Sequence, residues 1–184
     1  MAWSASAASA ESPYVPAFLV GSIFERHAQK SGIDALLLYS IAMAESGATK
    51  SKGYAAPHPL AIRASNKAYY PANKKEAESI LNSLLGEGER NIDVGLMQIN
   101  IFWHGSKVQS PVDLLDADTN LAVASQILLT AMRSSPGDIA VAIGRYHNWK
   151  DLERAQRYSQ RVLQLYKAIN GRIFATTGNT YAQP

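Results

Sequence analysis

The chain has 184 residues, of which 47% are hydrophobic and 18% charged, with 12 Gly, 8 Pro and no Cys. This composition is that of an ordinary globular protein and excludes collagen-like, low-complexity and disordered chains. The absence of cysteine excludes thiol nucleophiles, iron–sulfur clusters and disulfides. The formal net charge of +3 gives a mild attraction to polyanions, but no run of Lys or Arg indicates a nucleic-acid surface.

The two ends of the chain lack the periodicity of the rest. The first ten residues, MAWSASAASA, repeat small residues as a secretory signal does at its cleavage end, without the basic and apolar parts of a signal. We therefore expect residues 1–14 to be a signal-peptide remnant or a disordered tail, and residues 172–184 to be a C-terminal tail. Because the sequence has no run of 18 or more apolar residues, we expect no membrane span.

Residues 15–171 are predicted to form one compact, mainly helical domain. The segment 33–44 is apolar on nearly every side, which predicts a central helix surrounded by protein, ending before Gly47. Ser110 and Pro111 begin a short helix, as a capping residue and a first-turn proline. Helical spacing of apolar residues predicts the other helices at 15–29, 74–85, 118–133, 138–145 and 151–170, with Gly32 and Gly171 after the first and the last.

Two segments break the helical pattern. Residues 57–71 contain short β-prone pieces around the turn-type tripeptide at residues 65–67, which predicts a small hairpin. Residues 91–100 are too polar and glycine-interrupted for a long helix, so we expect a structured loop against the core. The fold class is therefore mainly α, with one small β-hairpin insert.

Glu45 follows the central apolar helix and is a candidate for acid chemistry. A carboxylate at a helix C-terminus opposes the helix dipole, and apolar neighbours raise its pKa. A glutamic acid that stays protonated near neutral pH is what a general acid requires. The alternative is an ordinary exposed Glu one turn beyond the core.

Other candidate chemistry in the sequence is weaker. Gln98 and Asn100 are amides among buried-type residues, where they either satisfy backbone groups or bind a ligand, and Gly95 allows close backbone approach. The sequence has no phosphate-binding loop and no serine nucleophile elbow. Metal binding is not expected, because the histidines lack ligand spacing such as HExxH: His27, His58, His104 and His147.

Five blocks in order resemble the soluble lytic transglycosylase domain, family 1: AMAESG, IDVGLMQIN, TNLAVASQIL, AIGRYHN and YSQRVLQLY. The resemblance covers roughly residues 33–166, and it implies a goose-lysozyme-like fold and a catalytic domain over 15–171. It also implies cleavage of the β-1,4 bond between N-acetylmuramic acid and N-acetylglucosamine in peptidoglycan. This reaction leaves 1,6-anhydromuramic ends without using water, and it needs no cofactor.

The resemblance also assigns site residues. Glu45 matches the single catalytic acid/base, and Ser46 matches the serine that follows it and sits by the acid and the substrate. Gln98 matches a glycan-binding glutamine, while Gly95 and Met97 match residues that shape the groove. Two further matches complete the comparison: Tyr146, whose hydroxyl lies near the acid in the family, and Asn120, which is expected to be structural.

The sequence departs from the family at two places. The family commonly has Asn after the matching tyrosine, where this chain has His147. The long insert between Glu45 and Gly95 is similar to the insert found in the branch of the family that is associated with conjugative transfer and type IV secretion or pilus systems. This insert is expected to form one wall of the glycan groove, with Tyr69 and Tyr70 on opposite faces of a strand. One of the two is expected to stack on a sugar and the other to pack on the domain.

Peptidoglycan glycan strands are thus the expected partner, with a secretion, conjugation or pilus complex as a further one, and the expected location is the periplasm. A lysozyme-type hydrolase remains an alternative, with Asp93 as the base for water, although a loop-structuring role suits Asp93 better. A noncatalytic peptidoglycan-binding assembly protein is a second alternative, which has no need of Glu45. Nucleic-acid binding is a third, weakly suggested by the Tyr69–Tyr70 pair and the lysines at 74 and 75.

Overall fold

A computed structural model describes residues 15–49, 55–65 and 67–178. The predicted signal remnant at residues 1–14 lies outside the described residues. The helices, including short 3-10 helices labelled η, are η1 Ala17–Leu19, α1 Ile23–Ser31, α2 Ala35–Ser46, α3 Lys74–Gly86, α4 Ile101–His104, η2 Gly105–Lys107, η3 Pro111–Leu115, α5 Ala117–Ser134, α6 Ile139–His147 and α7 Leu152–Gly178. The strands are β1 Gly47–Thr49, β2 Ala55–Pro57, β3 Ile62–Ala64, β4 Lys67–Tyr69, β5 Ile92–Val94 and β6 Ile99–Asn100.

The central position predicted for the apolar helix is confirmed. Helix α2 contacts α1, α7 and β2, and most of its side chains are buried. Its first turn is capped by Asp34, whose carboxylate accepts the Leu37 N–H at 2.7 Å, and the chain leaves the helix at Gly47. Helix α2 therefore carries Glu45 outward from the centre of the molecule.

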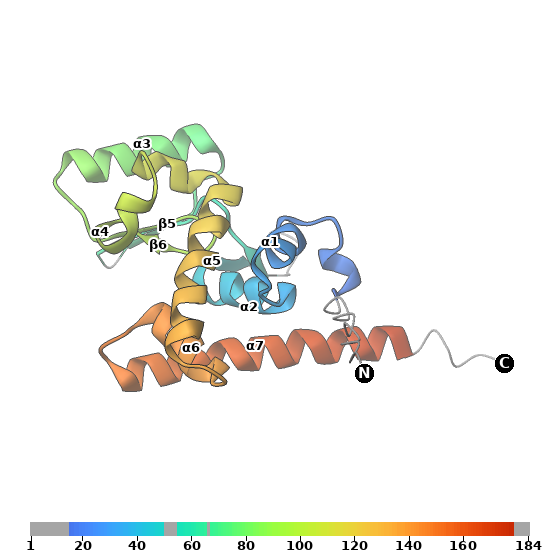
Figure 1. The fold of residues 1–184 in the computed structure, drawn as a ribbon. Helices are drawn as coiled ribbons and strands as arrows, with labels where there is room; N and C mark the ends of the chain where they lie inside the picture. The colour runs from blue at the N-terminus through green and yellow to red at the C-terminus, as the bar shows by residue number, and fades with distance from the viewer. Residues whose placement is uncertain (1–14, 50–54, 66, 179–184) are drawn as a thin grey trace, which may run out of the picture.

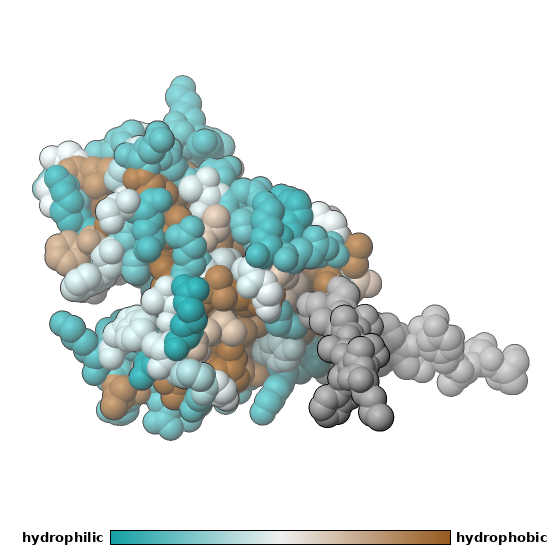
Figure 2. Space-filling model, in the orientation of Figure 1, coloured by the Kyte–Doolittle hydropathy of each residue, from teal (hydrophilic) through white to brown (hydrophobic). Residues whose placement is uncertain are grey.

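Two groups of elements lie on either side of α2 (Figure 1). The four-stranded sheet, α3 and α4 lie on one side, and α6 and α7 pack together on the other. Helix α5 extends from the first group to the second. In the space-filling view the left outline is notched between these two groups (Figure 2).

The predicted hairpin is present as β3 and β4, which pair antiparallel with Ile62 opposite Tyr69. It belongs to a larger antiparallel sheet of strand order β4-β3-β5-β6. The prediction of a loop over residues 91–100 is therefore wrong at both ends of this segment, which form β5 and β6. These strands have three and two residues, too few to show an alternating pattern. Strand β5 forms by pairing with the distant β3, and β6 by pairing with β5.

Two helix predictions need correction. The helix predicted over 15–29 is interrupted at Gly21, which has a φ of +73°, and Ser22 then caps a separate helix α1. The end predicted at Gly171 is also wrong, because α7 continues to Gly178. One glycine in a helix costs about 1 kcal/mol relative to alanine, which is too little to end a 27-residue helix.

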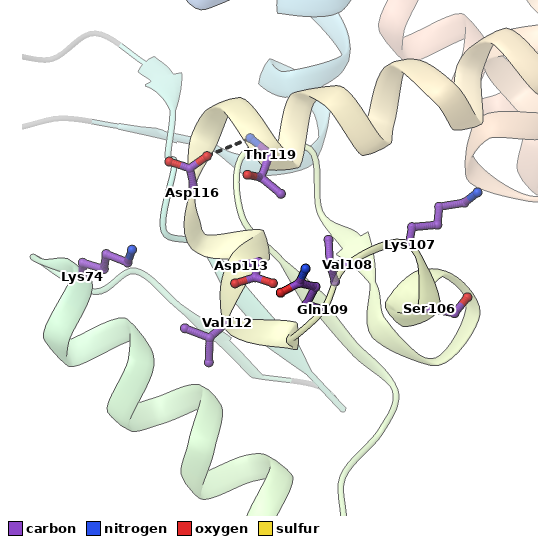
Figure 3. Close-up of a pocket in the computed structure, with 9 residues that line it drawn as sticks. All are labelled: Lys74, Ser106, Lys107, Val108, Gln109, Val112, Asp113, Asp116 and Thr119. Carbon is purple, nitrogen blue, oxygen red and sulfur yellow. Dashed lines mark hydrogen bonds between the residues drawn. The ribbon is translucent and has the colours of Figure 1, made fainter.

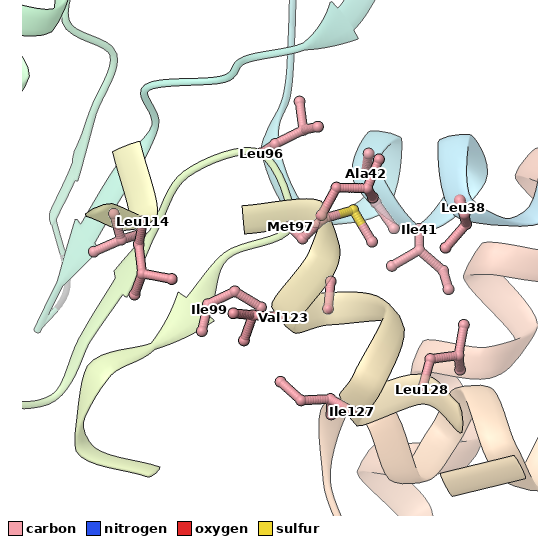
Figure 4. Packing of buried hydrophobic residues seen from close by; sticks show 14 of the residues in the cluster. Leu38, Ile41, Ala42, Leu96, Met97, Ile99, Leu114, Val123, Ile127 and Leu128 are labelled. Atoms are coloured by element: carbon pink, nitrogen blue, oxygen red, sulfur yellow. The ribbon is translucent and has the colours of Figure 1, made fainter. Parts of the chain in front are cut away.

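The buried core joins the segment after β5 to the helices (Figure 4). Met97 and Ile99 are 1% and 2% exposed and lie among side chains of α2 and α5. Their neighbours in this view include Leu38, Ile41, Ala42, Val123, Ile127 and Leu128. Burial of these two side chains fixes residues 95–98 against the end of α2, which positions the candidate site.

Candidate active site

Glu45 lies in the last turn of α2, with only 11% of its side chain exposed. The hydroxyl of Tyr158, on α7, donates a hydrogen bond of 2.6 Å to Glu45 Oε1. Burial raises the pKa of Glu45 to about 7, and the negative charge of Asp93 adds to this effect. The Tyr158 hydrogen bond and the charges of Arg63 and Arg161 act in the opposite direction but do not cancel it.

The protonation state that follows suits proton donation. Because Tyr158 donates to Oε1, a protonated Glu45 carries its own proton on Oε2. Burial raises the pKa values of Tyr146 and Tyr158 far above their usual value, so both hydroxyls stay neutral. The direction predicted for the Glu45 pKa from its apolar helix is thus confirmed.

Ser46 joins the end of α2 to two other segments. Its hydroxyl donates to the Leu96 carbonyl at 2.7 Å and accepts the His58 N–H at 3.1 Å. The side chain is only 1% exposed, so any contact with a glycan would have to open these bonds. In this structure Ser46 holds the turn at 95–98 and the segment before β3 beside Glu45.

The turn at residues 95–98 is built around Gly95 and Asn120. Gly95 has a φ of +81°, and a Cβ at this position would lie 2.3 Å from Asn120 Nδ2 and 2.5 Å from the Leu114 carbonyl oxygen. Asn120 is fully buried and accepts the Met97 N–H at 2.8 Å. Its amide donates to the carbonyls of Val94 and Leu114, so the structural role expected for Asn120 is confirmed.

Gln98 and Tyr146 complete the arrangement around this turn. The Gln98 amide donates 3.0 Å hydrogen bonds to the carbonyls of Ala61 and Gly95. Among the residues that the structure describes, no group donates to Gln98 Oε1, which is left as an acceptor. The Tyr146 hydroxyl donates to the Met97 carbonyl at 2.9 Å. The hydroxyl bonded to Glu45 is that of Tyr158, whereas Tyr146 supports the turn.

Asp93 lies on β5, directly across from Arg63 of β3. Its Oδ1 atom accepts a 2.8 Å hydrogen bond from Asn100 Nδ2, which also bonds Asn91. Burial raises the pKa of Asp93. These contacts support the loop-structuring role that the sequence favours for Asp93.

Tyr69 is the last residue of β4, and Tyr70 lies just beyond the strand, so the expectation that both lie on one strand is wrong. The surroundings of the two side chains nevertheless differ. Tyr69 is half-buried, packs against the core and lies beneath Lys67 Nζ, which is 4.7 Å from its ring centroid. Tyr70 is 49% exposed and makes an edge contact with His58 at 5.5 Å. His58 in turn donates its backbone N–H to Ser46, the residue that follows Glu45. Of the two tyrosines, Tyr70 is therefore the one that contacts a neighbour of the candidate acid.

We expect substitutions of these tyrosines to have unequal effects. Tyr70→Ala should weaken binding to purified glycan strands by about tenfold, the scale of one lost aromatic stacking contact. Tyr69→Ala should instead lower the free energy of unfolding by about 2–3 kcal/mol through lost burial. A cosedimentation assay and thermal unfolding measure the two effects. Equal binding by both variants and the wild type would assign the hairpin a purely structural role.

A concave region of the surface is lined by residues other than Glu45 (Figure 3). It has a volume of about 540 Å³ and is formed by the start of α3, the η2–η3 segment and the start of α5. Its lining combines apolar surface with charged side chains, which include Lys74, Lys107 and Asp116. None of the predicted site residues lines it. Among the described residues, no group of three or more His, Asp or Glu is arranged to hold a metal ion.

Sequence reasoning missed three groups that act on Glu45. Tyr158 lies in the predicted helix 151–170, and the available signal was that a buried tyrosine hydroxyl needs a hydrogen-bond partner. Arg63 and Arg161 influence the Glu45 pKa from β3 and α7. No local pattern identifies them, because they reach the site through the sheet and the helix packing.

The mainly α architecture with its small sheet is that of a lysozyme-like domain. The chain belongs to the transglycosylase SLT domain family, whose family model matches residues 22–165. This is a family of lytic transglycosylases, a class of glycan-cleaving enzymes, so the predicted resemblance is confirmed. Comparisons with curated proteins and with solved structures give no match. Within the described part of the chain, no helix is long and apolar enough to cross a membrane.

Proposed function

We propose that this protein is a peptidoglycan lytic transglycosylase. It would cleave the β-1,4 bond between N-acetylmuramic acid and N-acetylglucosamine and leave 1,6-anhydromuramic ends. The observation that carries the proposal is the buried carboxyl group of Glu45, whose pKa is raised to about 7. A group with that pKa can both give and recover a proton near neutral pH.

One carboxyl group suffices for the reaction. Glu45 donates its Oε2 proton to the glycosidic oxygen as the bond between that oxygen and C1 of the muramic sugar breaks. The resulting carboxylate then takes the proton of the muramic 6-hydroxyl as its oxygen bonds to C1. Glu45 loses one proton to the leaving group in the first step and gains another from the 6-hydroxyl in the second, and no water is consumed. This differs from the usual pair of carboxylates in glycosidases.

The other residues of the site have supporting roles in this proposal. Gln98 Oε1 accepts a hydrogen bond from a sugar hydroxyl or amide, while the Gln98 amide stays bonded to Ala61 and Gly95. Met97 and Gly95 shape the groove through their backbone, with Tyr146 supporting the Met97 carbonyl. Ser46 holds this turn beside Glu45. Tyr70 offers an exposed ring to a sugar.

The lysozyme-type alternative requires Asp93 to activate water. Asp93 Oδ1 is already bonded to Asn100, which favours the lytic reaction over hydrolysis. A noncatalytic binding protein is disfavoured, because such a protein gains nothing from burying a glutamic acid without a counter-ion in hydrogen-bond contact.

The mass of the muropeptides released from purified cell walls distinguishes these functions. A lytic transglycosylase releases anhydromuramic ends, which are lighter by one water than the reducing ends left by a hydrolase. We expect anhydro ends only. Reducing ends would establish the hydrolase, and no release by folded protein that still binds glycan would establish the binding protein.

The pH dependence follows from the sign of the Glu45 pKa shift. The free enzyme must hold Glu45 protonated, so kcat/KM should fall as pH rises through about 7. Above that value the loss is about tenfold for each pH unit. A turbidity assay on cell walls at constant ionic strength measures this profile. An increase in kcat/KM between pH 6 and 8 would mean that Glu45 acts first as a base.

The proposed setting is the cell envelope, where peptidoglycan lies, with export to the periplasm. The long insert between Glu45 and Gly95 supports an association with conjugative transfer, type IV secretion or pilus assembly. In this proposal the enzyme opens the cell wall for such a complex, without a cofactor and without binding nucleic acid.

A further inference from the structure

His147, at the position where the family commonly has Asn, is the last residue of α6 and lies against the acid. Its ring stacks on that of Tyr158, with centroids 4.3 Å apart and planes within 5°. Its Nδ1 atom is 3.9 Å from Glu45 Oε1, which is too long for a hydrogen bond. The stacked ring thus presents one nitrogen to Glu45 without yet bonding it.

Arg154, in the first turn of α7, determines which nitrogen of His147 carries the proton. Its Nε–H donates to His147 Nε2 at 3.3 Å. An arginine side chain has only donors, so the Nε2 atom that receives this bond has no proton. The proton of neutral His147 is therefore on Nδ1, which faces Glu45.

Burial and the surrounding positive charges both oppose protonation of His147. Burial, followed by the positive charges of Arg154, Arg63 and Arg161, lowers the pKa of His147 to about 4. The charges that act on His147 are those of Arg154 and Arg161 on α7 and Arg63 on β3. Glu45 on α2 lies 3.9 Å from its Nδ1 atom and Tyr158 stacks on its ring, while the charge of Asp93 acts on Glu45. In solution a histidine is more basic than a glutamate. Here the order is reversed, and the proton stays on the carboxyl group.

We propose that Arg154 and His147 are a pair of positioning residues for the acid. Arg154 fixes His147 as a neutral Nδ1–H imidazole, so that the proton stays on Glu45. The same Nδ1–H group is offered to the carboxylate that forms in the reaction. The role in the reaction rests on the proposed function, whereas the tautomer and the proton location do not. An approach of about 1 Å between Nδ1 and Oε1 makes the hydrogen bond. His147 gains and loses no proton.

Nitrogen-15 NMR of the histidine rings, with a carbon-13 titration of Glu45, tests the first half of this proposal without measuring activity. In the wild type we expect the His147 signal, assigned by its loss in His147→Asn, to be that of the neutral Nδ1–H form from pH 5 to 8. Arg154→Met should populate the Nε2–H form. It should raise the pKa of His147 by about one pH unit, because a positive charge that opposes the imidazolium is removed, whereas the pKa of Glu45 should not fall.

Arg157→Gln is the matched control, since Arg157 lies one turn further along α7 and pairs with Glu153. It removes the same charge from the same helix and should leave His147 unchanged. An Nε2–H form in the wild type, or identical titrations of Arg154→Met and Arg157→Gln, would overturn the proposal. Failure of the proposed function would show instead in the mass of the released muropeptides.

Substitutions of His147 test the second half. His147→Phe keeps the stacking on Tyr158 but has no donor, and we expect a tenfold to hundredfold lower kcat, roughly the loss of one hydrogen bond to a charged group. KM should stay nearly unchanged. His147→Asn restores an N–H donor and should recover most of the rate. Wild-type kcat in His147→Phe, or equal losses in both folded variants, would contradict the role in the reaction.

Discussion

Glu45→Gln is expected to lower kcat on purified peptidoglycan by about 10²- to 10⁴-fold, the contribution of a well-placed general acid. The amide has nearly the shape of the carboxylic acid and can still accept the Tyr158 hydrogen bond. It can neither donate nor recover the proton that the reaction exchanges. Release of muropeptides measured by chromatography gives the rate, and cosedimentation with intact cell walls gives the binding, which should be retained.

The matched control for Glu45→Gln is Glu78→Gln. Glu78 lies on α3 and makes an exposed ion pair with Lys74, so its substitution also removes one negative charge but should leave the rate unchanged. Circular dichroism should show the same helix content in both variants. A folded Glu45→Gln variant that retains more than about a tenth of the wild-type rate would exclude Glu45 as the general acid.

Gly95→Ala should destabilise the protein more than the same change at the other glycines of positive φ among the described residues. The new Cβ would lie at 2.3 Å from Asn120 Nδ2 and 2.5 Å from the Leu114 carbonyl oxygen. Relief of these contacts moves the Asn120 amide, which then loses its bonds to buried carbonyls. We expect about 3–5 kcal/mol less free energy of unfolding from backbone strain, overpacking and unsatisfied polar groups together. Chemical denaturation measures it.

Gly137→Ala separates backbone strain from crowding. Gly137 has a φ of +77°, nearly the same as that of Gly95, and no atom lies within 4 Å of its ideal Cβ. This variant should lose only about 1–2 kcal/mol, the cost of a non-glycine residue in the left-handed region. Similar losses in the two variants would mean that the contact with Asn120 does not set the shape of the turn at residues 95–98.

Local patterns predicted the helices well, because their boundaries depend on nearby residues. The apolar character of α2 and the polar residue at its start are visible in the sequence. The β5 strand was missed because it pairs with β3, which lies about thirty residues earlier, and the two-residue β6 strand was missed because it in turn pairs with β5. The continuation of α7 beyond Gly171 was missed because one glycine was given too much weight.

The candidate site was predictable only where one segment determines it. The apolar helix before Glu45 correctly indicated a raised pKa. The partner that donates to Glu45, Tyr158, is 113 residues away in the chain, and no spacing rule connects the two. For Ser46 and Met97 the sequence motif was misleading in another way. The resemblance places both at the substrate-binding groove, whereas each side chain is only 1% exposed. A motif gives the residue type but not the direction in which its side chain points.

The hydrogen bonds of Asn120 have a consequence for conformational entropy. A loop that becomes ordered only when its ligand binds loses about 1–2 kcal/mol of backbone entropy per residue, which weakens binding. In this chain the folded protein already fixes the turn at residues 95–98, through Asn120, Ser46 and Tyr146. A long, stiff polymer such as a glycan strand can therefore bind to a turn that is already ordered. The binding free energy is then not reduced by the entropy cost of ordering this turn.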